Sequence, residues 1–106
     1  MPDLKAKPTL ADIQGYVMLL EKERGFAEDS VLQKCLLLSE EVGELFKAVR
    51  KEHAGMPLAT DSTAGQAEEE MADILVVLST IANRLGIDLE QALRAKEEKN
   101  KQRRWS

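Results

Sequence analysis

The 106-residue chain is poor in the side chains that supply covalent cross-links, nitrogen or sulfur metal ligands, and aromatic surfaces. It has one cysteine, one histidine, one tryptophan, one tyrosine and two phenylalanines. Its single cysteine, Cys35, excludes an intrachain disulfide and fits a reducing compartment. Because Cys35 lies among leucines, we expect it to be a small residue of the core and not a nucleophile.

Long hydrophobic stretches are also missing. No segment reaches the ~20 apolar residues that span a bilayer, and the N-terminal MPDLKAKPTLADIQ lacks the apolar run of a signal peptide. The net charge of −4 argues against a general nucleic-acid-binding protein. With 43% apolar and 32% charged residues, the composition fits one globular domain over residues 1–106. We therefore expect a cytoplasmic protein that binds neither membranes nor nucleic acid polymers.

The alternating pattern of a β-strand is absent too, whereas apolar residues recur with helical spacing along most of the chain. The predicted helices span residues 10–24, 31–52, 65–85 and 89–100. The residues expected to cap them are Thr9, Asp29 or Ser30, Gly86 and Asp88. Residues 53–64 are rich in Gly, Pro and short polar residues, which predict a loop. The sequence thus predicts an all-α subunit of four helices.

The apolar residues of the second and third predicted helices indicate how they pack. We assign Phe46, on the second helix, to the core. In the third helix, residues 74–78 are all apolar, and at about 100° per residue they surround the helix. One chain of this length cannot enclose such a segment, so we expect a second subunit to pack against it. Gly43, without a side chain, would let another helix approach closely.

Two of the predicted helices carry carboxylates at a three-residue step, Glu41 with Glu44 and Glu70 with Asp73. Residues three apart share a helix face, and here their neighbours are mostly leucine, valine and glutamate. Lys47 alone is placed to offset the repulsion. Since negative charge beside an apolar stripe is costly without a positive partner, these helices need a cation between them.

The carboxylates indicate a hard divalent cation such as Mg²⁺ or Mn²⁺, because both prefer oxygen ligands. Helices two and three should pack antiparallel across their loop, which would bring the two pairs together. Di-iron bundles use Glu-x-x-His pairs, and the one histidine, His53, belongs to neither set, so iron is disfavoured. A solvated charged face explains most Glu-rich helices, but two sets flanked by leucine and valine favour the metal site.

Three stretches of the sequence carry a family pattern: EEVGEL at 40–45, EEMADIL at 69–75, and LGIDLEQALRAKEEKNKQRRW at 85–105. They closely resemble the MazG-like all-α nucleoside triphosphate pyrophosphohydrolases, whose pattern is EExxE, a spacer and ExxD. The resemblance implies an oligomeric helical bundle, for which we expect a tetramer in preference to a dimer. It also implies Mg²⁺-dependent hydrolysis of a (deoxy)nucleoside triphosphate to the monophosphate and pyrophosphate, in nucleotide house-cleaning or pool balancing, with Mn²⁺ as a substitute ion.

The same resemblance assigns roles to particular residues. The metal ligands would be Glu41, Glu44, Glu70 and Asp73, with Glu41 also in the catalytic group. Glu40 would be the base that activates water, the ligand of a further ion, or a solvent-facing residue. The family's KxxKN stretch implies that Lys96 and Asn100 contact the nucleotide; a cationic helix end that complements the helix dipole is the alternative.

Three further residues are candidates for substrate binding. Lys34 lies two turns before Glu41 on the same helix face and would reach the outer phosphates. Phe26 and Trp105 are candidates to stack on the base. Two other interpretations remain open at this point: a dUTPase-like or phosphoribosyl-ATP pyrophosphohydrolase of the same superfamily, and a non-catalytic helical interaction module.

Overall fold

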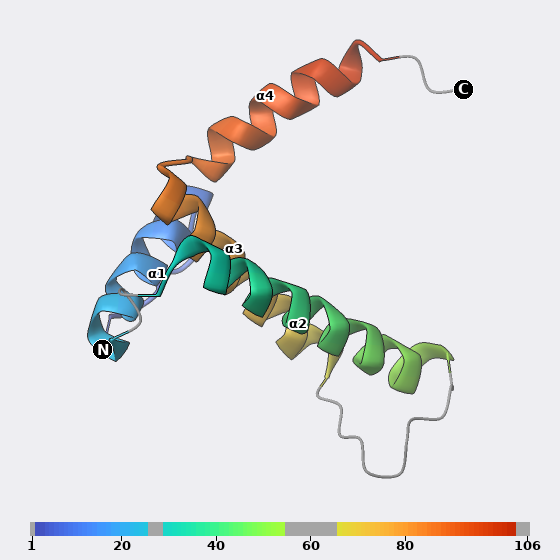
Figure 1. Ribbon diagram of the computed structural model, residues 1–106. Coiled ribbons are helices and arrows are strands. Elements are labelled where there is room, and N and C mark those ends of the chain that lie inside the picture. Colours follow the sequence, from blue (N-terminus) through green and yellow to red (C-terminus); the bar gives the residue numbers. More distant parts are fainter. Residues whose placement is uncertain (1, 26–28, 55–65, 104–106) are drawn as a thin grey trace.

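The computed structural model describes residues 2–25, 29–54 and 66–103, and it confirms the all-α prediction. Four α-helices follow one another along the chain (Figure 1): α1 (Leu10–Arg24), α2 (Val31–Val49), α3 (Ala67–Leu85) and α4 (Leu89–Lys101). A π-helical turn, η1 (Arg50–Ala54), continues α2. No helix in the described part of the chain is long and apolar enough to cross a bilayer.

Local sequence sets the helix ends, as predicted. The side chains of Thr9, Ser30 and Asp88 each accept a hydrogen bond from the backbone N–H three residues later, which satisfies donors that the first helical turn leaves unpaired. Ser30, and not Asp29, caps α2. Gly25 and Gly86 end α1 and α3 with φ of 77° and 68°, a left-handed conformation that favours glycine.

A hydrogen bond from the start of α3 to the turn η1, which continues α2, holds the two helices together at this end. Gln66 precedes α3 without forming a side-chain cap. Instead, Oε1 of Glu52 in η1 accepts a hydrogen bond of 3.2 Å from the backbone N–H of Ala67. A carboxylate at this position also complements the positive end of the helix dipole. The contact therefore holds the far end of α2 beside the first turn of α3.

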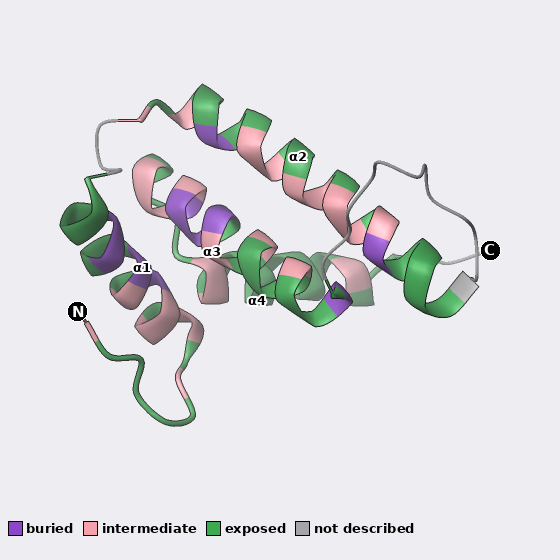
Figure 2. Ribbon diagram, turned by 90° about the horizontal axis from the view of Figure 1, so that it is seen from below, coloured by how far each residue is buried: buried purple, intermediate pink, exposed green. Residues whose placement is uncertain are grey.

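Helices α2 and α3 lie side by side, and α1 packs across the C-terminal half of α3 (Figure 1). Figure 2 shows buried residues on the facing sides of these three helices. The small apolar core consists of Val17, Leu20, Ala48, Ala67, Val77 and Ala82. Helix α4 extends away from this three-helix body and contains no buried residue. The described residues therefore leave one face of each long helix uncovered.

A network of hydrogen bonds around Gln14 of α1 joins this helix to the end of α3 and the start of α4. Gln14 is only 8% exposed. Its amide nitrogen donates to Asn83 Oδ1 at 3.0 Å and to the carbonyl of Ile87 at 2.8 Å, and its oxygen accepts from the backbone N–H of Leu89 at 2.9 Å. Both polar atoms of the buried amide group of Gln14 therefore have hydrogen-bond partners, and these bonds connect α1 to the turn between α3 and α4.

Two predictions about the core were wrong for the single chain. Cys35 is exposed, and Phe46 retains 64% of its accessible surface. The reason is the side of α2 that faces α3: Lys34, Glu41 and Ala48 follow at seven-residue steps and make this contact stripe. Phe46, two residues before Ala48, lies about 160° around the helix from it. It belongs to an exposed surface that we call the outer face of α2, composed of Leu32, Cys35, Leu36, Gly43 and Phe46.

The apolar segment of α3 is covered on one side only. Val77 packs inside the subunit at 8% exposure, whereas Leu75 and Leu78 remain 39% and 40% exposed. A Cβ atom added at Gly43 on α2 would meet no atom of the described residues within 4 Å, so none of the four described helices approaches that glycine closely. Apolar surface on both α2 and α3 thus remains exposed in the single chain. The second subunit expected from the sequence would cover such a surface.

Candidate metal centre

Three carboxylates converge between α2 and α3. Glu41 projects from α2, and Glu70 and Asp73, one helical turn apart, project from α3. One oxygen from each residue can be chosen so that all three lie within 4.8 Å of one another. We call this group the acidic cluster. Such a set of oxygen atoms matches the ligand preference of a hard divalent cation.

The acidic cluster raises the pKa of Glu41 above its ordinary value. Burial is the largest cause, followed by the negative charge of Asp73, a hydrogen bond with Glu70, and the charges of Glu70 and Glu44. Each of these causes favours the protonated form, because each makes the anion more costly. A cation held by the cluster would reverse this balance. The residues present therefore fit a divalent metal ion, in both donor type and electrostatic demand.

The pKa of Glu41 predicts how pH affects the metal-free protein. The folded state holds this proton more tightly than the unfolded state, whose pKa is near the ordinary 4.5. The resulting stabilisation is complete below that pH and is lost as the pH rises through the folded-state pKa. In EDTA, the melting temperature of the native protein should therefore fall relative to that of Glu41→Gln as the pH rises from 4 to 8. Melting curves whose difference does not change with pH would contradict this prediction.

The other predicted carboxylates stand apart from the cluster. Glu44 raises the pKa of Glu41 by its charge, but its own carboxylate pairs with Lys47 at 3.6 Å, where both side chains are 41% exposed. Glu40 is exposed on α2, about 100° around the helix from Glu41. The structure therefore brings together three of the four predicted ligands. The roles of Glu44 and Glu40 stay predictions.

The predicted substrate-binding residues lie in different parts of the molecule. Lys34 is 7% exposed and its Nζ pairs with Asp29 Oδ2 at 3.3 Å, on the stripe of α2 that contains Glu41. Lys96 is exposed on α4. Asn100 donates from Nδ2 to Glu97 at 3.2 Å, while its Oδ1 is buried without a hydrogen-bond partner among the described residues. Phe26 and Trp105 lie outside the described residues.

Sequence reasoning missed a small pocket beside the cluster, where α1, α2 and α3 meet. Its apolar lining is Leu20, Leu37, Val76 and Val77, and Glu21, Arg24, Lys34 and Thr80 add polar or charged groups. The signal was present in the spacing, because Leu37 is four residues before Glu41 and Val77 is four residues after Asp73. What the sequence lacked was the position of α1, which supplies the third wall.

The fold and the acidic cluster define an all-α protein with a candidate divalent-metal centre between two antiparallel helices. Residues 29–105 match the model of the MazG nucleotide pyrophosphohydrolase domain. The match covers well over half of the chain and includes both the cluster and α4. The chain belongs to this family, which confirms the resemblance found in the sequence.

Individual proteins similar to this chain come from Bacillus subtilis (strain 168). The uncharacterized protein YvdC is 30% identical over 96 residues, which cover 85% of this chain and 91% of YvdC. YpjD is 33% identical over 92 residues, covering 87% of this chain and 79% of YpjD. A crystal structure of YpjD, described there as a candidate pyrophosphatase, superposes with a TM-score of 0.75 and 32% identity over 90% of this chain and 97% of that one.

Proposed function

We propose that this protein hydrolyses (deoxy)nucleoside triphosphates between the α and β phosphates, which releases the monophosphate and pyrophosphate. The observation that carries the proposal is the acidic cluster, placed within a chain of the MazG nucleotide pyrophosphohydrolase family. Removal of surplus or non-standard nucleotides in the cytoplasm is the corresponding cellular role. Cleavage by water at the α-phosphorus gives two products, of which pyrophosphate is easily measured.

Glu41, Glu70 and Asp73 are the proposed ligands of Mg²⁺, and Glu44 joins them when it turns from Lys47. When bound, Mg²⁺ screens the charge of the triphosphate and polarises the phosphoryl group toward an in-line attack by water; Mn²⁺ has the same preference for oxygen. Glu40, exposed one residue before Glu41, is the proposed acceptor of the proton from that water or the ligand of a further ion. Burial partly desolvates the carboxylate of Glu41, which strengthens its interaction with a cation.

The substrate panel that tests the proposal contains the common ribo- and deoxynucleoside triphosphates, with release of pyrophosphate measured in Mg²⁺. We expect pyrophosphate and the monophosphate in equal amounts, loss of activity in EDTA, and partial recovery in Mn²⁺. Release of inorganic phosphate instead, or the absence of any hydrolysis, would contradict the proposal. Turnover of phosphoribosyl-ATP alone would assign the chain to that branch of the superfamily.

Lys96 and Asn100 on α4 are proposed to bind the triphosphate. Asn100 already has a buried oxygen without a partner among the described residues, and Lys96 presents an exposed ammonium group one turn before it. Alanine at either position should weaken substrate binding by about 1–3 kcal/mol, the scale of a charge-assisted hydrogen bond. The melting temperature should hardly change, since α4 buries no residue.

Steady-state kinetics of Lys96→Ala and Asn100→Ala, beside Lys101→Ala, check this prediction. Lys101 is exposed at the end of the same helix and pairs with Glu98 at 3.9 Å, so it controls for lost positive charge. A Michaelis constant that rises for Lys96→Ala and Asn100→Ala but not for Lys101→Ala is the expected result. Equal kinetic constants in all three variants and the native protein would contradict nucleotide binding by Lys96 and Asn100. These residues would then only complement the dipole at the end of α4.

The active form is proposed to be a homo-oligomer, with a tetramer expected in preference to a dimer. The support is the uncovered apolar surface: the outer face of α2 with Leu32 at 72% and Leu36 at 62% exposure, and Leu75 and Leu78 on α3. Contiguous exposed apolar surface of this kind is typical of protein–protein contacts. Since α4 extends away from its own three-helix body, it is free to lie against another subunit.

A further inference from the structure

The pocket at the corner of α1, α2 and α3 has a volume of about 120 Å³. Residues from all three helices line it: Leu20, Leu37, Val76 and Val77 are apolar, and Glu21, Arg24, Lys34 and Thr80 are polar or charged. Leu20, Val77 and Thr80 are at most 8% exposed, so much of the pocket is held by the packed interior of the subunit. Arg24, which also lines the pocket, is exposed. A small apolar space with a few polar groups is the usual form of a site for a small organic ring.

The pocket follows the acidic cluster along the same contact between α2 and α3. Leu37 is four residues from Glu41, and Thr80 is seven residues from Asp73. Val76, which also lines the pocket, is three residues from Asp73. At a rise of 1.5 Å per residue, the lining residues lie about 5 to 10 Å along the helices from the cluster. The ribose of a nucleotide bridges a gap of this order between its α-phosphate and its base. The cluster and the pocket are therefore spaced as two parts of one nucleotide site.

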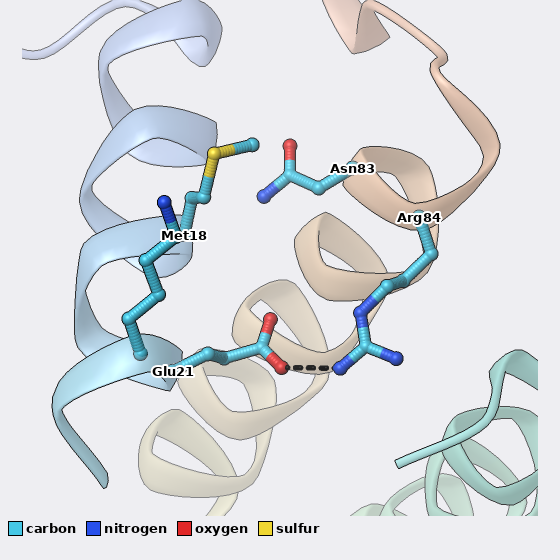
Figure 3. A pocket seen from close by; sticks show the side chains of 5 residues that line it. Met18, Glu21, Asn83 and Arg84 are labelled. Carbon is cyan, nitrogen blue, oxygen red and sulfur yellow. Dashed lines mark hydrogen bonds and ion pairs between the residues drawn. The ribbon is translucent and has the colours of Figure 1, made fainter. Parts of the chain in front are cut away.

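Two of the charged groups that line the pocket, Lys34 and Glu21, are paired within the chain. Lys34 pairs with Asp29, and Arg84 of α3 pairs with Glu21 of α1 at 3.0 Å, as Figure 3 shows. Arg84 also donates a hydrogen bond to the backbone carbonyl of Asp29. Because Lys34 and Glu21 have partners of opposite charge, and because leucine and valine supply half of the eight lining residues, the interior of the pocket is poorly suited to a phosphate group. Arg24, the remaining cation of the lining, is exposed. The interior of the pocket suits a neutral ring.

A second cavity of about 150 Å³ lies between α1 and α3 (Figure 3). Its described lining, which includes Met18, Asn83 and Arg84, contains no residue of α2. It therefore has no wall in common with the helix that supplies Glu41. Of the two cavities, the corner pocket is the one that continues the metal centre.

We propose that the corner pocket binds the nucleobase and that its size selects pyrimidine over purine nucleotides. The inference rests on the proposed function. A cavity of about 150 Å³ engineered in another protein holds one benzene ring, so a pocket of about 120 Å³ has room for a single ring at most and excludes the second ring of a purine. Selection arises because a purine would have to displace buried Leu20 or Val77, which the packed core resists.

Polar groups are available for the edge of a pyrimidine. Thr80 Oγ1 donates to the carbonyl of Val76 at 3.2 Å, and a hydroxyl that donates can still accept. It is placed to accept from the ring N–H of uracil or thymine, or from the amino group of cytosine. Lys34, which the sequence led us to expect at the outer phosphates, instead brings its ammonium group to this pocket, where a ring carbonyl is a suitable acceptor. The corner thus offers both a donor and an acceptor to a pyrimidine.

The test is the specificity constant kcat/KM for dCTP, dUTP, dTTP, dATP and dGTP in Mg²⁺, for the native protein, Leu37→Ala and Leu38→Ala. Both leucines are half-buried neighbours on α2, but Leu38 is not among the residues that line the pocket. We expect pyrimidine substrates to be preferred by about tenfold or more, the discrimination that a tight apolar pocket provides. Leu37→Ala should lower this preference at least about threefold through the KM of the purines, and Leu38→Ala should not. If Leu37→Ala does not fold, Val76→Ala replaces it in the test, because Val76 also lines the pocket and its truncation to alanine removes a smaller volume.

Each outcome has a distinct meaning. Equal specificity constants for all five substrates, or a preference for purines, would overturn the base pocket and leave the proposed function intact. Equal changes in Leu37→Ala and Leu38→Ala would also overturn the pocket. If no substrate is hydrolysed, the proposed function fails, and binding of the α,β-imido analogues of dUTP and dATP then decides the pocket separately. Tighter binding of the uracil analogue supports it, and equal affinities overturn it.

Discussion

Replacing Glu41 with glutamine is expected to reduce hydrolysis by roughly 100-fold or more while the melting temperature of the metal-free protein rises. Glutamine keeps the shape of the side chain but removes the negative charge that a metal ligand supplies. Loss of one ligand should cost about 3 kcal/mol of transition-state stabilisation, which corresponds to this change in rate. The gain in stability follows from the raised pKa of Glu41, since its charge is unfavourable beside Asp73 and Glu70.

The control is Glu68→Gln, a matched substitution at an exposed position on α3 that lies outside the acidic cluster. Kinetics in saturating Mg²⁺ and thermal melting with and without Mg²⁺ are measured for both variants and for Asp73→Asn. Addition of Mg²⁺ should stabilise the native protein and Glu68→Gln, but much less Glu41→Gln and Asp73→Asn, because a ligand stabilises only the state that binds it. Full activity of Glu41→Gln or Asp73→Asn would show that the cluster is not the metal centre.

The sequence predicted the helices well because their signals are local. Periodic apolar residues mark each helix, and Thr9, Ser30, Gly86 and Asp88 end them by hydrogen bonds or φ angles within a few residues. The extent of the second helix, expected to residue 52, is matched by α2 together with its π-helical continuation. Local rules were sufficient because each of these contacts spans less than one turn of helix.

Much of the acidic cluster was predicted for a similar reason. Glu70 and Asp73 share a face by their spacing alone, and the antiparallel packing of α2 and α3 brings Glu41 to them. Glu44 does not join the cluster, because its carboxylate forms an ion pair with Lys47, one turn later. The sequence indicated that Lys47 is within reach of Glu44, but whether the carboxylate turns to Lys47 or to the cluster depends on side-chain conformations, which the helical pattern does not contain. The corner pocket was missed because its volume depends on how closely three helices approach.

Phe46 and Cys35 show where a pattern of apolar residues is insufficient. The pattern indicates which residues avoid water, but not which chain covers them. In α2, the stripe facing α3 includes buried Lys34 and half-buried Glu41, while apolar residues occupy the outer face. An arrangement with charges inside and leucines outside is unusual for an isolated subunit. It is understandable if the charges form the site and the outer face is covered in an assembly, and this leads to the last prediction.

Replacing Phe46 or Leu36 with lysine is expected to separate the oligomer into folded subunits and to remove most of the activity. Both side chains are more than 60% exposed in the single chain, at 64% and 62%, so lysine should not disturb the subunit itself. In an assembly that covers the outer face of α2, the same lysine would be a buried charge without a partner, at a cost of about 3–5 kcal/mol. Each 1.4 kcal/mol is a factor of about ten in the dissociation constant, so a loss of affinity of more than 100-fold is expected.

Light scattering and circular dichroism at micromolar concentration check this prediction, with Leu19→Lys as the control. Leu19 is 57% exposed, but it lies on α1, away from the outer face of α2. Val77→Lys is not a useful probe, because Val77 is buried inside the subunit and its replacement would unfold the chain instead. The expected pattern is native helix content in all three variants, with a smaller particle only for Phe46→Lys and Leu36→Lys. An active, monomeric native protein would refute the assembly, and equal dissociation in Leu19→Lys would refute its assignment to α2.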